Sequence, residues 1–138
     1  GKSRMKKLTE ADAATAYAKA WNRLDPSEFI DLLTSDARYA SQWVFEELTS
    51  KQAIGDYLTA KMSSIKMNME KDPEVIVFAE LGKTATSLSN RDCVILAQGT
   101  RENVKAVVHF GVEDNKIKRY DLSIPELVPI NRSGVYPV

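Results

Sequence analysis

The side chains able to perform acid–base or nucleophilic chemistry are few, because His109 is the only histidine and Cys93 the only cysteine of the chain. A serine becomes a nucleophile when a base lies beside it, so Ser41 with His109 is a candidate pair. In the strand that alternation predicts here, His109 has the opposite parity to Val108 and Phe110 and faces away from them. Ser41 is predicted to face inward, so the two are not expected to meet. We interpret His109 as a surface or interface residue.

Other reactive or ligand-binding groups have little support in the composition. A metal site needs several converging His, Cys or carboxylate ligands, and one His with one Cys does not provide them, so no metal is expected. Cys93 shares a strand face with Ile95 and Ala97, which indicates a buried, unreactive thiol. Arg91 and Asp92 begin that strand and belong either to a cavity or to a turn surface. No cofactor is expected, because the glycines lack the spacing of a phosphate-binding loop: Gly55, Gly82, Gly99, Gly111 and Gly134.

Aromatic side chains are the remaining candidates for a site. Tyrosine and tryptophan carry polar groups that need partners when they are buried, so a cavity lined by them suits a flat, mostly apolar ligand with a few oxygens. The same residues also form ordinary cores, and this alternative stays open. The aromatic set comprises Tyr17, Trp21, Tyr39, Trp43, Tyr57, Phe110 and Tyr120.

A β-hairpin from Val104 to Ile124 is the element that would position these residues. Alternation along its first strand predicts two faces. One face carries Val104, Ala106, Val108, Phe110 and Val112, and the other carries Lys105, Val107, His109, Gly111 and Glu113. Asp114 and Asn115 tolerate the positive φ of a two-residue turn, after which Tyr120, Leu122 and Ile124 alternate again.

Capping signals and apolar periodicity predict three helices. The first spans about Thr9 to Leu24 and begins with a capping box of Thr9 and Asp12. A short second helix follows near Pro26 to Leu33, with Asp25 as its N-cap. The third spans about Ser50 to Met67, with Thr49 and Gln52 as its capping box. Lys61, Lys66 and Lys71 are expected on its solvated surface.

The other segments read as strands joined by short turns, which leave no room for crossover helices and therefore favour a mostly antiparallel sheet. These strands are Ala37 to Phe45, bent into a short hairpin before Leu48; Glu74 to Leu81, with a continuation through Thr84 to Leu88; and Arg91 to Gly99. The tail beyond Pro125 is expected to be irregular. The element order predicts an α+β fold: a strongly curved sheet of four to six strands with about three helices over its concave face, enclosing a cone.

With this order, the chain resembles the nuclear transport factor 2-like superfamily from about Thr9 to Leu127. The likeness lies in AYAKAWNRLDPSEF, in LLTSDARYASQW followed by LTSKQAIGDYL, and in HFGVEDNKIKRYDL. The resemblance, closest to the polyketide cyclase and ketosteroid isomerase-like branch, implies a cone-shaped α+β barrel that holds a hydrophobic small molecule. It also implies a homodimer formed through the outer sheet face, which would carry Val107 and His109.

The steroid isomerase branch offers a sharp comparison, because its chemistry needs a carboxylate base, a tyrosine and a protonated aspartic acid. The tyrosine of that branch matches Tyr17, its base falls at Ser41, and its second acid at Val108. A serine without its own base cannot take an α-proton at neutral pH, and valine donates no hydrogen bond. Two of the three roles are therefore empty, and this reaction is not expected.

The function we predict is the binding of a hydrophobic ligand in the cone. The alternatives are a small cyclase, isomerase or dehydratase acting on a polyketide- or steroid-like substrate, and a protein-interaction domain. A carboxylate reaching the cone, such as Asp36 or Asp121, would favour the enzyme. The predicted ligand-binding residues are Tyr17, Tyr39, Ser41, Trp43, Tyr57, Val108, Phe110 and Tyr120.

Composition limits the partners. The chain has 138 residues, with 19 Lys plus Arg and 19 Asp plus Glu, so no net field favours nucleic acid or an anionic membrane. One domain over residues 1–138 is expected, in which residues 1–8 form a solvated tail, partly a cloning remnant before Met5. No apolar run approaches the length of about 20 residues that spans a bilayer. With a lone cysteine, these features lead us to expect a cytoplasmic protein.

Overall fold

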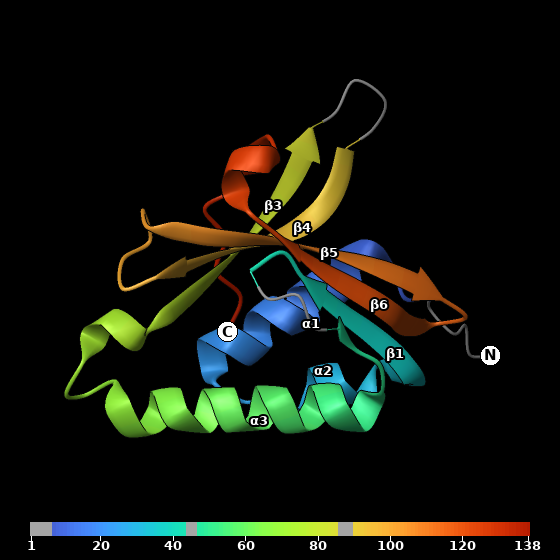
Figure 1. Cartoon of the computed structure of the whole chain (residues 1–138). Coiled ribbons are helices and arrows are strands. Elements are labelled where there is room, and N and C mark those ends of the chain that lie inside the picture. Colours follow the sequence, from blue (N-terminus) through green and yellow to red (C-terminus); the bar gives the residue numbers. More distant parts are fainter. Residues whose placement is uncertain (1–6, 44–46, 86–89) are drawn as a thin grey trace, which may run out of the picture.

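The computed structural model describes residues 7–43, 47–85 and 90–138. Figure 1 shows a strongly curved sheet with α1, α2 and α3 gathered on one of its sides. The predicted α+β class is confirmed, including its mostly antiparallel, curved sheet and its three helices. None of the described helices is both long enough and apolar enough to span a membrane.

The three helices begin where polar side chains satisfy their free backbone N–H groups. Helix α1 (Glu10–Arg23) opens with the predicted capping box, in which Thr9 and Asp12 each accept a hydrogen bond from the other's backbone. Helix α3 (Lys51–Asn68) is capped by Ser50, whose hydroxyl accepts from the backbone N–H of Ala53. The prediction of Thr49 as that cap was wrong, because the neighbouring serine takes the extended cap conformation.

Helix α2 (Ser27–Asp31) is a single short turn of helix. Pro26 occupies the N-cap position predicted for Asp25. The Asp25 carboxylate nevertheless accepts hydrogen bonds from the backbone N–H and the hydroxyl of Ser27, at 3.1 and 2.8 Å. Asp25 therefore marks the start of the helix as predicted, although it lies one residue before the N-cap position.

Within the described residues, the sheet has seven strands in the order β2-β1-β6-β5-β4-β3-β7, more than the four to six predicted. All neighbouring strands pair antiparallel except β1 and β6, which are parallel. The strands are β1 (Leu33–Ser41), β2 (Glu47–Leu48), β3 (Val77–Ala85), β4 (Asn90–Gln98), β5 (Val104–Glu113), β6 (Lys116–Ser123) and β7 (Ile130–Arg132).

Two sequence predictions about strands need correction. The first strand starts at Leu33 instead of Ala37 and ends at Ser41, while residues 44–46 of the predicted strand lie outside the described residues, as do residues 86–89. The tail is not irregular throughout: it contains a turn of 3-10 helix (Pro125–Leu127) and β7, which pairs with β3. A three-residue strand is too short to display the alternation by which strands are recognised.

The hairpin of β5 and β6 forms as predicted, with Asp114 and Asn115 at positive φ in its turn. On the inner face of β5, Val108 and Phe110 belong to the main core beneath the helices. The outer face holds a second cluster of Cys93, Ile95 and Val107, against which the tail packs Val128 and Ile130. Burial raises the pKa of the Cys93 thiol to about 12, so the prediction of an unreactive thiol is supported.

The C-terminal segment is held on this outer face by a buried carboxylate. Glu80 of β3 accepts hydrogen bonds from the Arg132 guanidinium at 2.7 Å and from the backbone N–H of Gly134 at 2.6 Å. A second tie joins the Asn22 side-chain amide to the Pro137 carbonyl at 2.6 Å. Val107, expected on an exposed dimer face, is consequently 0% exposed within one chain. The premise that this valine is available to a partner was wrong.

His109 lies on the outer face, opposite in parity to Val108 and Phe110. Its Nε2 is 2.9 Å from the Thr84 hydroxyl. Burial lowers the pKa of the imidazole below its ordinary value of 6.5, and the neighbouring Arg91 lowers it further, while Glu10 and Asp121 act in the opposite direction. The native state therefore favours the neutral imidazole.

We expect the melting temperature to fall as the pH is lowered from about 7 to about 5, because the unfolded chain binds a proton at His109 more readily than the native state does. The stabilisation is present above the ordinary pKa of 6.5 and is lost as the pH falls through the depressed native value. Thermal melts across this range test the effect. A His109→Gln variant should show a flatter dependence, because the chain has no other histidine. An unchanged slope in the variant would contradict the assignment.

Candidate functional site

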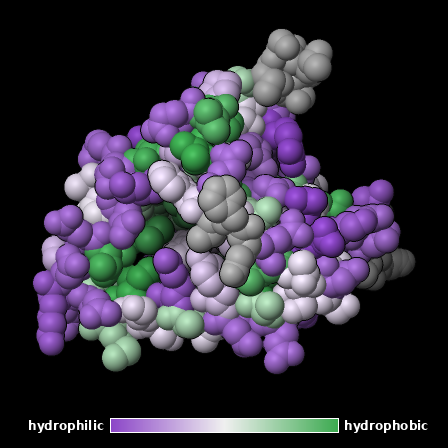
Figure 2. All heavy atoms as spheres, viewed as in Figure 1, coloured by the Kyte–Doolittle hydropathy of each residue, from purple (hydrophilic) through white to green (hydrophobic). Residues whose placement is uncertain are grey.

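A pocket of about 440 Å³ opens between the helices and the sheet. Figure 2 shows a hollow on this side of the molecule with hydrophobic residues in its wall. Its lining residues are Tyr17, Trp21, Tyr39, Ser41, Trp43, Tyr57, Lys61, Val77, Leu96, Ala97, Gln98, Lys105, Ala106 and Leu122.

The local periodicity of each element brings these side chains to one place. Tyr17 and Trp21 are four residues apart on α1, as are Tyr57 and Lys61 on α3, and this spacing places both members of a pair on the same helix face. Tyr39 and Ser41 are two residues apart on β1 and therefore share a sheet face. The two helices and β1 thus turn polar-tipped side chains toward one space.

Stacked and edge-on aromatic rings form the deep end of the site. The Tyr17 ring lies 5.0 Å from Phe29 and 5.3 Å from Phe110, centroid to centroid. Tyr39 stacks on Tyr120 at 4.5 Å. Aromatic pairs of this geometry add stabilisation beyond their buried area, so these contacts hold the rings of this wall together.

The structure brings five of the eight predicted ligand-binding residues to the pocket: Tyr17, Tyr39, Ser41, Trp43 and Tyr57. The other three, Val108, Phe110 and Tyr120, are 0% exposed and belong to the core instead. Placing them on the cavity surface was wrong. They lie on the predicted face of the sheet, but the side chains of α1 and α2 fill the space above them.

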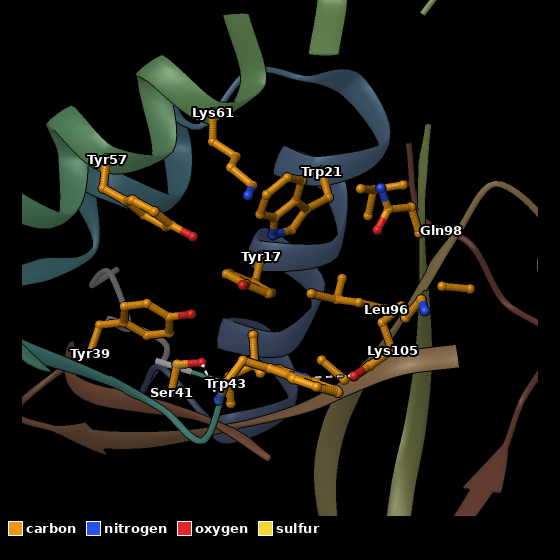
Figure 3. A pocket seen from close by; sticks show the side chains of 14 residues that line it. Tyr17, Trp21, Tyr39, Ser41, Trp43, Tyr57, Lys61, Leu96, Gln98 and Lys105 are labelled. Atoms are coloured by element: carbon orange, nitrogen blue, oxygen red, sulfur yellow. Dashed lines mark hydrogen bonds between the residues drawn. The ribbon is translucent and has the colours of Figure 1, made fainter. Parts of the chain in front are cut away.

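The polar tips of the lining residues point into the same space. Figure 3 shows the hydroxyls of Tyr17, Tyr39 and Tyr57 directed toward the centre of the pocket, together with the Lys61 ammonium and the Trp21 indole nitrogen. The indole N–H of Trp21 is buried and has no hydrogen-bond partner among the described residues. A buried donor without a partner costs free energy, and a ligand acceptor that reached this N–H would recover that cost.

The tyrosine hydroxyls keep their protons in this environment. Burial raises the pKa of Tyr17 well above its ordinary value of 10.0, only partly offset by the nearby Trp21 indole. Burial, with the neighbouring Tyr57, raises the pKa of Tyr39 to about 12. Both groups are therefore hydrogen-bond donors at neutral pH and not bases.

Trp43 lies at the mouth of the pocket, just beyond the end of β1. Its side chain is 58% exposed, and its Nε1 donates a hydrogen bond of 2.9 Å to the Lys105 carbonyl of β5. Its backbone N–H donates to the Ser41 hydroxyl at 3.1 Å. The indole is thus fixed between the end of β1 and the start of β5, where it forms the outer wall.

The sequence analysis missed several lining residues. Trp21 was in the aromatic set but not among the predicted ligand-binding residues, and Lys61 was assigned to a solvated surface. Lys61 is exposed, yet it also borders the pocket. The helical spacing of four residues from Tyr57 is the signal that points to it. The apolar residues Val77, Leu96, Ala97 and Leu122 carry no comparable signal, because they resemble any core strand residue.

No aspartate or glutamate is among the described residues that line the pocket. Asp121 forms an ion pair with Arg119 at 2.7 Å, and Asp36 borders a separate surface depression with Lys118. Neither supplies the carboxylate that would favour an enzyme. Across the described ranges, no three His, Cys, Asp or Glu side chains are grouped so that they could hold a metal ion.

Comparison with models of known protein families assigns this chain to one of them. A family model described as a SnoaL-like domain matches residues 14–120, which include β1, α3 and β5 together with most of α1 and of β6. The chain belongs to the SnoaL-like domain family. The comparison of this chain with curated proteins found no match.

Solved structures confirm the fold. A nuclear transport factor 2-like protein of unknown function from Cytophaga hutchinsonii superposes with a TM-score of 0.58 and 10% identity, over 90% of this chain and 96% of the other. A proposed polyketide cyclase from Sinorhizobium meliloti gives 0.56 at 15% identity, over 80% and 93%. A proposed isomerase of the SnoaL-like family from Agrobacterium tumefaciens gives 0.51 at 13%, over 83% and 96%. At these identities the likeness shows the fold alone.

The three positions matched to the isomerase branch are separated in this SnoaL-like domain. Tyr17 and Ser41 border the pocket, whereas Val108 is buried in the core and does not reach it. The pocket keeps a tyrosine donor but has neither carboxylate of that reaction at the matched positions.

Proposed function

We propose that the pocket binds a flat, mostly apolar small molecule that carries a hydrogen-bond acceptor oxygen. The observation that carries this proposal is the indole N–H of Trp21, which is buried, has no partner among the described residues and faces the pocket beside the Tyr17 hydroxyl. An acceptor oxygen placed between these two groups satisfies the free donor and recovers the cost of its burial.

The size and walls of the pocket support the same ligand class. Its volume of about 440 Å³ lies in the range of small-molecule sites. Tyr39, stacked against Tyr57 at 5.9 Å, forms an aromatic wall, and Figure 3 shows Leu96 across the pocket from it. A fused-ring body packs well between surfaces of this kind.

Catalysis is the second candidate, and one arrangement favours it. Two donors that meet at one ligand oxygen, Tyr17 and Trp21, are the kind of group that stabilises a developing oxyanion. Some similar structures are described as a proposed polyketide cyclase and a proposed isomerase. We place binding first, because no described lining residue is a carboxylate base.

Matched fluorescent probes test the binding proposal. Trp21 and Trp43 are the only tryptophans of the chain and both line the pocket, so their emission should be quenched by pyrene compounds that enter it. Pyrenecarboxaldehyde, which carries an acceptor oxygen, should bind about fivefold more tightly than pyrene itself. A Trp21→Phe variant should lose this preference, because it keeps a ring but lacks the N–H.

The matched control is Trp43→Phe. This variant removes the other indole N–H, which already donates to the Lys105 carbonyl, and should keep the preference for the aldehyde. Binding is followed by the anisotropy of the probe, so that it does not depend on the tryptophan that was removed. If neither probe binds the wild type, the pocket is not a ligand site. If Trp21→Phe keeps the preference, the indole is not the donor.

We also propose that the protein is cytoplasmic and that it forms a homodimer. The lone, buried Cys93 is compatible with a reducing compartment. The homodimer follows from the superfamily resemblance, but its surface cannot include Val107, which the tail covers. The alternative of a protein-interaction domain requires a broad exposed apolar patch. Among the described residues, the exposed large apolar side chains outside the pocket are Met67 on α3 and Leu127, Val135 and Val138 in the C-terminal segment.

A further inference from the structure

We infer that the ligand is an acid, whose carboxylate or comparable anionic oxygen group is held at the Lys61 side of the pocket. This inference rests on the proposed binding function and names the chemical class of its ligand. It is supported by the charge of the pocket and its set of hydrogen-bond donors, whereas the binding function is supported by the shape of the pocket and the Trp21 donor.

The position of Lys61 is the first step. Lys61 lies one helical turn after Tyr57 on α3 and borders the pocket. In Figure 3 its ammonium group points toward the Trp21 indole, into the space that the tyrosine hydroxyls also face. A lysine in this orientation presents a positive charge to whatever occupies the pocket.

The charge of the pocket is the second step. Lys61 and Lys105 are the two charged residues among the described lining residues, and both are cationic. None of the ion pairs formed within the described part of the chain includes Lys61. Among the described residues, the Lys61 ammonium therefore has no carboxylate that neutralises it. An anionic group of a ligand would supply the missing negative charge.

The hydrogen-bonding groups give the third step. The hydroxyls of Tyr17 and Tyr39 and the indole N–H of Trp21 can all donate, and the Trp21 N–H lacks a partner among the described residues. A carboxylate has several lone pairs and can accept from more than one such donor at once. A ligand ammonium would find aromatic faces here, but it would also lie beside Lys61 with no described lining carboxylate to pair with. The donors and the positive charge of Lys61 together favour an anionic ligand group over a cationic one.

Three pyrene probes of one shape and different charge test the inference: pyrenecarboxylate, pyrenecarboxamide and pyrenemethylammonium. We expect the wild type to bind the carboxylate most tightly and the ammonium least. Lys61→Met should weaken the carboxylate about fivefold, which is the effect of one partly exposed charge-assisted contact, and leave the carboxamide nearly unchanged. Higher salt should reduce the preference for the carboxylate in the wild type and have less effect in the variant.

Lys66→Met is the matched control, because Lys66 is an exposed lysine of the same helix that does not line the pocket. It changes the net charge equally and should leave the order of the three probes as in the wild type. Equal binding of carboxylate and carboxamide, or an equal loss in both lysine variants, overturns the inference while leaving the binding function intact. Tightest binding of the ammonium probe also overturns it. Failure of all three probes to bind contradicts the binding function itself.

Discussion

Replacing Val108 with arginine is expected to lower the free energy of unfolding by about 4 kcal/mol or more, because the change combines overpacking with a buried unpaired charge. Val108 is 0% exposed and belongs to the main core between β5 and the helices. It pairs with Val94 on one side and Leu122 on the other, and it is not among the residues that line the pocket. Urea unfolding and thermal melts measure the loss.

The control for this substitution is Gln98→Arg. Gln98 is exposed at the rim of the pocket, so a guanidinium there reaches water and should cost little stability. The sequence pattern alone predicts the reverse for Val108→Arg: a stable protein whose pocket is blocked. A variant that melts like the wild type and no longer binds pyrene probes would show that Val108 faces the cavity.

Replacing Val107 with aspartate is expected to unfold the outer side of the sheet, at a cost of about 3 kcal/mol or more, since a carboxylate would be buried without a partner. Val107 is 0% exposed and packs with Cys93 and Ile95 under the tail residues Val128 and Ile130. Loss of this contact should release the segment that carries β7. Thermal melts give the stability, and reaction of the Cys93 thiol with a disulfide reagent reports exposure of the outer cluster.

Val107→Ala provides a graded comparison, because it shortens the side chain without burying a charge and should cost about 1–2 kcal/mol. If Val107 lay on an exposed dimer face, as the superfamily resemblance implies, Val107→Asp would leave the fold intact and shift a dimer toward the monomer. A folded, monomeric Val107→Asp protein with an unreactive Cys93 would contradict the packing described above. Sedimentation of the wild type over a range of concentrations tests the proposed homodimer separately, since it requires no substitution.

Local signals in the sequence determined the elements and their faces. The Thr9–Asp12 capping box fixed the start of α1, because reciprocal bonds to backbone N–H groups involve only neighbours in the chain. The Asp114-Asn115 turn fixed the hairpin, because both residues tolerate positive φ. Alternation then placed Phe110 inward and His109 outward. These features depend on interactions between residues a few positions apart, which a sequence displays directly.

Tertiary structure alone decided the depth of each side chain below the surface. Ala106 and Val108 share the inner face of β5, but the first borders the pocket and the second is enclosed in the core. The rings of Tyr17 and Phe29 pack on Phe110, next along this face from Val108, whereas Ala106 lies beside Leu96 of β4 and both residues border the pocket. Period-two alternation specifies a face of the sheet, and it contains no information about what packs on that face.

The outer face of the sheet was decided in the same way. The alternation of its own strand predicts that Val107 is partly exposed. In the structure, the C-terminal segment pairs with β3 through β7, and its residues Val128 and Ile130 pack against the cluster that contains Val107. The tie that holds this segment joins Glu80 to Arg132, 52 positions apart, through a buried carboxylate. Lys61 likewise borders the pocket only because α3 packs over the sheet in the tertiary structure. Contacts between distant parts of the chain cannot be read from local periodicity, because they form only when the packed elements bring these residues together.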